Sequence, residues 1–208
     1  MAIEDFTTYT EVDPNNHIGL VGTNHIDLNA YCNEDAYCYK DKGAAHFTDF
    51  EHKVDVQPIS ASDTYCYGCN WLLSNAVDDY AGLRTAGETC VVVRTGHWTA
   101  AYPQLYLSEY YGSTEYNNGP FDAAYNTWYY LTIKKLGTAL TCKIYSDSAR
   151  TTLLNTLSLT LQADHSFRYI FAANTQNEAA AKNYDQDIEN LDLQEGPAVG
   201  PSRAYIIG

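Results

Sequence analysis

The sequence contains no long hydrophobic run, and this absence excludes one class of protein. No apolar stretch approaches the length of about 18 to 20 residues that a helix needs to cross a bilayer. Residues 1–10 have neither a basic start nor an apolar segment, so we expect no secretory signal and no membrane insertion. No Asn-x-Ser/Thr sequon occurs, which removes any sequence support for N-glycosylation.

Positive charge is also scarce. The 208 residues include 12 Lys and Arg against 26 Asp and Glu, a formal net charge of −14, and the acidic residues are scattered. A surface of this sign repels phosphate groups, so we expect neither nucleic acid nor anionic membrane as a partner. The carboxylates favour solubility, and they also supply oxygen ligands of the kind that Ca²⁺ prefers.

Catalytic motifs are missing as well. The chain has no Gly-x-Ser-x-Gly, no His-Glu-x-x-His, no Gly-x-Gly-x-x-Gly and no P-loop. From these absences we predict a protein that is not an enzyme.

Tyrosine, by contrast, is abundant. There are 19 Tyr, many Thr, and Met only as Met1, a composition that favours pleated sheet over helix. One β-sandwich can use a chain of this length, so we predict a single all-β domain over residues 1–195.

Period-two alternation supports this prediction. Phe50, His52, Val54 and Val56 alternate with polar residues, as in a strand with one buried face. Gly137 lies between two further alternating runs and predicts a tight hairpin. The expected strands are 18–21, 26–30, 50–56, 90–94, 104–110, 128–135, 140–146, 152–161, 167–171 and 188–193. Turn clusters separate them, including 13–16 and 117–120, and helix evidence is limited to 75–84 and 177–182.

The C-terminal segment, 196–208, differs in texture. Gly and Pro residues make it a spacer, and the apolar residues that follow could form one more strand. That strand can fold back on its own sheet or pair with the edge of a neighbouring copy. The residues expected to make the intermolecular contact are Tyr205, Ile206 and Ile207.

The six cysteines form an even set that suits disulfides in an oxidising setting. They are Cys32, Cys38, Cys66, Cys69, Cys90 and Cys142. We expect local disulfides Cys32–Cys38 and Cys66–Cys69. Cys90 and Cys142 are expected on inward strand faces, either packed as thiols or bridged. A four-thiolate zinc site made from the first four is the alternative. A virion component released by cell lysis could form its disulfides outside the cell, although its sequence carries no secretory signal peptide.

Three segments carry a resemblance to a known family. The hairpin from Asn126 to Asp147, with its Trp128-Tyr129 strand and Gly turn, resembles the central hairpin of concanavalin A-like, laminin-G-like jelly-roll domains. Phe47–Val56 is similar to the strand that opens their curved sheet, and Asp187–Leu193 to the closing strand. The resemblance spans roughly Phe6 to Glu195 and implies a two-sheet antiparallel jelly roll with minimal helix. It implies the fold more firmly than any activity.

The glucanase branch of this family places its catalytic carboxylates on one strand, as Glu-x-Asp-x-x-Glu, and that run is absent here. The nearest set is Asp185, Asp187 and Glu189, which we interpret as a solvated strand face or a Ca²⁺ site. Asp78 and Asp79, adjacent in a loop, are the second calcium candidate.

Aromatic side chains supply the candidate glycan-binding site, because sugar rings stack on exposed Trp and Tyr faces. The candidates are Trp71, Trp98, Tyr102, Tyr106 and Tyr110. Core packing or a subunit interface is the alternative for each of them.

Two functions are consistent with these patterns. The first is structural: a jelly-roll subunit of a virion or extracellular filament that contacts copies of itself through the C-terminal segment. The second is a carbohydrate-binding module for adhesion or host recognition. We expect an extracellular or virion-associated protein in either case.

Overall fold

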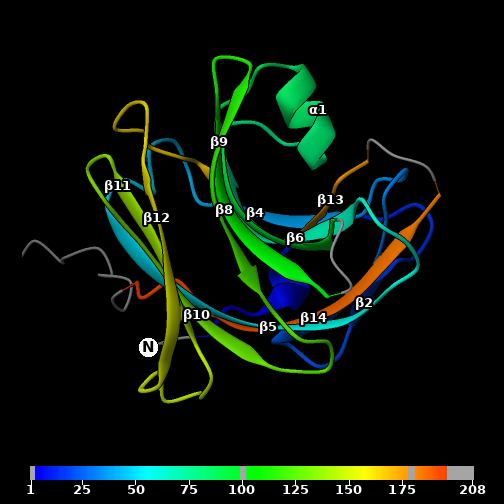
Figure 1. Cartoon of the computed structure of the whole chain (residues 1–208). Helices are drawn as coiled ribbons and strands as arrows, with labels where there is room; N and C mark the ends of the chain where they lie inside the picture. The colour runs from blue at the N-terminus through cyan, green and yellow to red at the C-terminus, as the bar shows by residue number, and fades with distance from the viewer. Residues whose placement is uncertain (1–2, 99–101, 178–180, 196–208) are drawn as a thin grey trace, which may run out of the picture.

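The chain folds as two stacked antiparallel sheets (Figure 1). The structure is a computed structural model and describes residues 3–98, 102–177 and 181–195. We call the two layers the lower and the upper sheet, after their places in Figure 1. The predicted all-β, two-sheet antiparallel sandwich with minimal helix is confirmed.

The lower sheet comprises, in spatial order, β12 (Leu153–Thr160), β11 (Ala139–Tyr145), β10 (Tyr129–Leu136), β5 (Phe50–Ala61), β14 (Asn183–Asp192), β3 (His25–Tyr31) and β2 (Ile18–Leu20). The upper sheet comprises β1 (Thr10–Val12), β4 (Tyr37–Asp41), β13 (Tyr169–Thr175), β6 (Cys66–Ser74), β7 (Cys90–His97), β8 (Gln104–Tyr111) and β9 (Thr114–Asp122). A 3₁₀ turn, η1 (Phe6–Thr8), and one short helix, α1 (Tyr80–Thr85), complete the described elements.

Alternating side chains of the lower sheet build the core between the layers. Along β10 the buried Leu131 and Ile133 alternate with the partly exposed Thr132 and the exposed Lys134. Successive residues of a strand point to opposite faces, so the apolar row turns inward against the upper sheet. The predicted Gly137 turn joins β10 to β11, and the two strands pair up to the turn, where Leu136 lies opposite Ala139.

Strand β6 is buried on both faces and shows no alternation. Its inward residues join the interlayer core, whereas its outward residue Leu72 packs with Val92, Phe171 and Leu83 of α1 in a second apolar cluster. Figure 1 shows α1 above the upper sheet. A strand covered on both faces has no alternation of apolar and polar residues, which is why the period-two pattern did not predict β6.

The turn predicted at residues 117–120 is wrong. Those residues lie within β9, an edge strand, at an irregularity in its pairing with β8. Gly119 has φ of +145°, and a Cβ there would lie 2.9 Å from the carbonyl oxygen of Leu105. Proline is tolerated on an edge strand because one side of that strand has no ladder to complete, so Pro120 marks a bulge instead of a turn.

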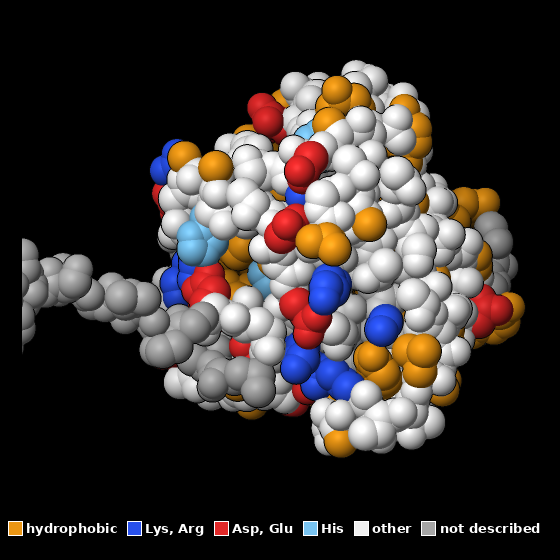
Figure 2. All heavy atoms as spheres, turned by 90° about the vertical axis from the view of Figure 1, so that its left-hand side faces the viewer, with side chains coloured by type: hydrophobic (Ala, Val, Ile, Leu, Met, Phe, Trp, Pro, Cys, Tyr) orange, Lys and Arg blue, Asp and Glu red, His pale blue; other side chains and the backbone are white. Residues whose placement is uncertain are grey.

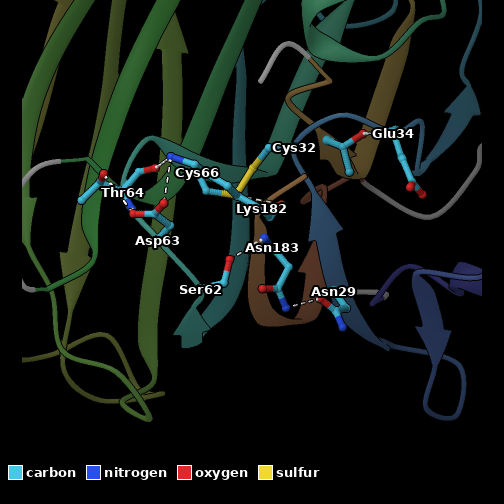
Figure 3. The surroundings of a disulfide bond; sticks show 10 residues. Asn29, Cys32, Glu34, Ser62, Asp63, Thr64, Cys66, Lys182 and Asn183 are labelled. Atoms are coloured by element: carbon cyan, nitrogen blue, oxygen red, sulfur yellow. Dashed lines mark hydrogen bonds and ion pairs between the residues drawn. A yellow bond between two sulfur atoms is a disulfide. The ribbon is translucent and has the colours of Figure 1, made fainter. Parts of the chain in front are cut away.

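A disulfide joins the two sheets, and it is not one of the local pairs we expected. Cys32, just after β3, is bonded to Cys66, the first residue of β6 (Figure 3). The sandwich brings these residues together although 34 positions separate them. The expected pairs Cys32–Cys38 and Cys66–Cys69, and the four-thiolate zinc alternative, are therefore wrong.

The other four cysteines, Cys38, Cys69, Cys90 and Cys142, are free and buried. Burial raises the pKa of Cys38, Cys90 and Cys142 to about 12 and that of Cys69 further. Of the two interpretations we gave for Cys90 and Cys142, packed thiols are correct.

No helix in the described part of the chain is long and apolar enough to span a membrane. The tail residues Tyr205, Ile206 and Ile207 lie outside the described residues, so their role in assembly stays a prediction.

Candidate functional site

A small pocket of about 190 Å³ opens on the outer face of the upper sheet, the side on which α1 lies. Strands β6, β7 and β9 contribute to its lining, as do α1 and the segments next to β6, β7 and β13. The lining residues are Tyr65, Tyr67, Arg84, Arg94, Trp98, Glu115 and Gln176.

Two stacked rings form one part of the pocket lining. The rings of Tyr67 and Trp98 are parallel within 2°, with centroids 4.9 Å apart, and the Tyr106 ring lies 4.8 Å from that of Trp98. Tyr67 pairs with Gly96 across β6 and β7, and a Cβ on Gly96 would lie 2.2 Å from that of Tyr67. The glycine is thus what allows the tyrosine to lie close to β7.

Arg94 is the buried charge of the pocket, with 3% of its surface exposed. Its guanidinium forms an ion pair with Glu115 and lies 4.8 Å and 4.7 Å from the ring centroids of Tyr67 and Trp98. Burial alone would lower the pKa of Arg94, but Tyr80, Tyr67 and Glu115 raise it above its ordinary value. The side chain is therefore a permanently charged donor, stabilised by aromatic faces.

Two buried polar atoms of the lining have no hydrogen-bond partner among the described residues. They are Nε of Arg94, a donor, and Oε1 of Gln176, an acceptor. The backbone oxygen of Gln176 accepts a hydrogen bond from Ala81 N at 3.2 Å, which ties this residue to α1. Buried polar atoms are usually paired, so a donor and an acceptor left over in one pocket indicate a place for a polar ligand group.

Tyr65 forms the exposed part of the lining, with 56% of its surface accessible. Its φ is +57°, a region that non-glycine residues other than Asn and Asp seldom adopt. A 3.1 Å hydrogen bond from Tyr65 N to the Trp98 carbonyl oxygen holds it beside the stacked rings. Backbone strain of this kind concentrates at functional sites.

The structure separates the five predicted glycan-binding aromatics. Trp98 lines the pocket and Tyr106 packs against it. Tyr102 is 42% exposed but is not part of the lining. Tyr110, at 8% exposure, packs in the apolar cluster under α1, so it does not offer a ring face to a ligand.

Trp71 does not form a glycan-binding surface, and our prediction for it is wrong. The residue is fully buried between the sheets, where its ring packs against Phe50 and His52. Its Nε1 donates to Nδ1 of His52 at 3.1 Å. Burial, together with the nearby charges of His46 and Lys42, lowers the pKa of His52 to about 3, so the ring stays neutral and can accept this hydrogen bond.

Sequence reasoning missed most of the pocket. Arg94 ends the apolar run of β7, and a lone charge in such a run was the available signal for it. Tyr65 and Tyr67 flank Cys66, and the sequence pattern at this segment predicted only a disulfide or a zinc ligand. The contributions of Glu115 and Gln176 depend on pairings across the sheet that no local pattern shows.

The calcium candidates are engaged in other contacts. Asp79 caps α1 by accepting from Gly82 N at 2.9 Å; burial, with the carboxyls of Asp35 and Asp78, raises its pKa to about 6. Asp187 accepts from His25 at 2.8 Å.

Burial, with Asp27 and Asp187 nearby, also raises the pKa of Asp185. No group of three His, Cys, Asp or Glu side chains within the described ranges is arranged to hold a metal ion. A calcium role for Asp78 with Asp79 or for Asp185 with Asp187 therefore stays a prediction.

Comparison by sequence finds no relative: no protein-family model matches the chain, and no curated protein does. Comparison of folds finds several solved structures. A protein of unknown function from Saccharomyces cerevisiae aligns with a TM-score of 0.58 at 11% identity, over 93% of this chain and 98% of its own. The exoplasmic/lumenal domain of VIP36, in a form bound to Ca²⁺ and Man3GlcNAc, aligns with a TM-score of 0.58 at 12% sequence identity. The alignment covers 94% of this chain and 90% of the VIP36 domain. Alginate lyase Aly36B aligns with 0.55 at 12%, over 91% of each chain.

The chain has a concanavalin A-like jelly-roll fold. This confirms the resemblance seen in the sequence. Identities near one residue in nine show the fold alone, and a fold hosts many functions.

One expectation is overturned by the comparison. We predicted that the protein is not an enzyme, but an alginate lyase has the same fold as this jelly roll. The absence of the glucanase carboxylate pattern excludes one catalytic arrangement on this architecture and leaves others available, so the prediction was wrong as a general statement.

Proposed function

We propose that the protein binds carbohydrate, with a sugar ring held in the pocket beside Tyr65 and Trp98. The observation that carries the proposal is the pair of unpartnered polar atoms, Arg94 Nε and Gln176 Oε1, in an aromatic-lined pocket.

The chemistry of the lining fits a sugar. A sugar hydroxyl is both a donor and an acceptor, so one such group can satisfy Gln176 Oε1 and a neighbouring one can accept from Arg94. The apolar face of the ring can lie against an aromatic side chain, which Tyr65 offers because it is more than half exposed. Burying one or two ligand groups among aromatic faces, with a few placed polar contacts, is the usual design of a small-molecule site.

Two further observations support the proposal. The fold neighbours include the lumenal domain of VIP36 in a form bound to Man3GlcNAc, and an alginate lyase. The disulfide between Cys32 and Cys66 suits an oxidising compartment, so we place the binding activity outside the cytosol, at the cell exterior. The alternative of a self-assembling structural subunit gains no support from these neighbours.

The first test removes the stacked ring. A glycan array screened with the labelled protein should show defined binders, and Trp98→Ala should lower affinity for them by about tenfold or more. Tyr111→Ala is the matched control, because Tyr111 is an exposed aromatic, 39% accessible, that does not line the pocket. Absence of any binder at millimolar concentration, or equal losses in both variants, would contradict the proposal.

The second test separates binding from stability at one residue. Tyr65→Asn keeps the backbone contact to Trp98 and places a residue that tolerates positive φ where tyrosine is strained. We expect the free energy of unfolding in urea to stay equal or to rise by up to about 1 kcal/mol, while sugar binding is lost. If affinity is unchanged in this variant, Tyr65 is not part of the site.

A further inference from the structure

A second hollow, of about 390 Å³, lies on the outer face of the lower sheet, on the opposite side of the sandwich from the pocket. It spans β5, β10 and β11 and the turn after β11. Its lining residues are Glu51, Lys53, Thr132, Lys134, Thr141, Lys143, Tyr145, Ser148, Ala149 and Arg150. Four of the 12 Lys and Arg of this acidic chain therefore meet in one place. Figure 2 shows Lys and Arg side chains gathered beside acidic ones on the side of the molecule that it faces.

Strand register sets the positions of the charges. Thr132 pairs with Lys53 on one side and with Lys143 on the other, so the three side chains form a row across the sheet. Neighbouring strands are about 4.8 Å apart, which puts the two lysine backbones about 10 Å apart with a hydroxyl between them. In the next row Lys134 lies between Glu51 and Thr141.

Two of the four cations are neutralised within the protein and two are not. Arg150 pairs with Asp55 at 2.6 Å, and Lys134 with Glu51 at 3.3 Å. Among the described residues no acidic side chain forms an ion pair with Lys53 or Lys143, although Asp192 lies opposite Lys53 in the register of β14 with β5. Lys53 and Lys143 carry like charges in one row and repel each other, so their proximity does not stabilise the fold.

The turn that walls the hollow is held in place. The Asp147 carboxylate accepts from Thr152 N at 2.7 Å and from Thr151 N at 3.1 Å, and these bonds lower the pKa of Asp147. Arg150 adopts φ of +55° and donates from Nε to the Leu131 carbonyl oxygen at 3.3 Å. Ser148 and Arg150 are thereby fixed beside the lysine row.

We propose that this hollow binds a sugar that carries a tetrahedral oxyanion, as a sulfate or phosphate ester. The oxyanion lies between Lys53 and Lys143, where ammonium donors from both sides and the Thr132 hydroxyl surround it. The hydroxyls of Thr141 and Ser148 and the ring of Tyr145 face the remaining volume, which exceeds what a free anion fills and falls within the range of small-molecule sites. This is a separate site from the proposed pocket and does not depend on it.

The test uses the full chain at low salt and four probes: glucose 6-sulfate, glucose 6-phosphate, glucose and inorganic sulfate. Calorimetric titration should show binding of one or both esters, with glucose and inorganic sulfate each at least tenfold weaker. Lys53→Gln and Lys143→Gln should each weaken ester binding about tenfold, since a charge-assisted hydrogen bond is lost. Arg168→Gln is the matched control: it removes one positive charge from an exposed pair with Asp41, and ester affinity should change less than twofold.

Each contrary result overturns the proposal in a distinct way. Equal binding of glucose shows that the oxyanion is not recognised, and equal binding of inorganic sulfate shows that the sugar is not. Loss of ester binding in Trp98→Ala, with the lysine variants unaffected, assigns the ester to the pocket on the upper sheet. A dimer in light scattering that Lys53→Gln or Lys143→Gln dissociates, without ester binding to the wild type, makes the hollow an interface between copies. The same thermal unfolding midpoint in wild type and variants shows that the lysine substitutions leave the fold intact.

Discussion

Replacing Trp71 with alanine should lower the free energy of unfolding by about 3 to 5 kcal/mol, the range for removing a large aromatic side chain from a packed core. The residue is fully buried and packs in the interlayer core against Phe50 and His52. Its removal leaves a cavity between the two sheets, and the paired strands on either side cannot move in to fill it. It also leaves Nδ1 of His52 without its hydrogen-bond donor. Equilibrium urea unfolding measures the loss.

Two companion variants sharpen this measurement. Trp71→Phe retains most of the packing and loses the hydrogen bond, so its cost should fall clearly below that of the alanine variant. Trp98→Ala, at the edge of the pocket, should lower the free energy of unfolding by less than half as much as Trp71→Ala. If the two tryptophan-to-alanine variants are equally stable, the assignment of one to the core and the other to the site is wrong.

Removing the disulfide has the second large effect. The double variant Cys32→Ala with Cys66→Ala should lose roughly 3 to 4 kcal/mol, because the bond closes a loop spanning 34 positions and restricts the unfolded chain. Both cysteines are fully buried, and alanine avoids placing a hydroxyl among apolar neighbours. Sugar binding should weaken too, since Cys66 lies between Tyr65 and Tyr67 of the pocket and anchors them to the lower sheet.

Reductant supplies the control for this prediction. Dithiothreitol should lower the unfolding midpoint of the wild type toward that of the double variant and leave the double variant unchanged. A wild type that keeps its midpoint after all six thiols have been shown to be reduced would contradict the stabilising role of the bond.

The lower sheet was largely predictable from the sequence. Strands β5, β10, β11 and β12 face the core on one side and solvent on the other over much of their length, so their apolar residues recur with period two. The Gly137 turn fixes the register of the hairpin between β10 and β11, whereas the pairing of β10 with β5 joins segments far apart in the chain.

The upper sheet was predictable only in part. β6 is covered on both faces, so its nine residues show burial without alternation. β9 contains residues that favour turns, which the edge of a sheet accommodates as a bulge. β1 and β4 are short, and the pairing of β4 with β13 joins residues far apart in the chain. In each case the information is in the tertiary contacts.

The candidate site shows the same limit for side chains. Trp71 and Trp98 look alike as candidates in the sequence, but one lies between the sheets and the other on the outer face. Which face of a strand a residue occupies depends on a bulge between Cys69 and Trp71, which shifts the alternation along β6. Without that irregularity, the pattern of residues does not show that Trp71 lies in the core.

The four buried free thiols can also report local unfolding of the sandwich, because they become reactive only when they are exposed. Reagents such as dithionitrobenzoate react with thiolates, and burial suppresses both ionisation and access at Cys38, Cys69, Cys90 and Cys142. Cys38 and Cys142 lie between the sheets, whereas Cys69 and Cys90 lie under α1. The rate at which the reagent modifies Cys38 and Cys142 would measure separation of the two sheets. The rate at which it modifies Cys69 and Cys90 would measure displacement of α1 from the upper sheet, and neither measurement needs an added label.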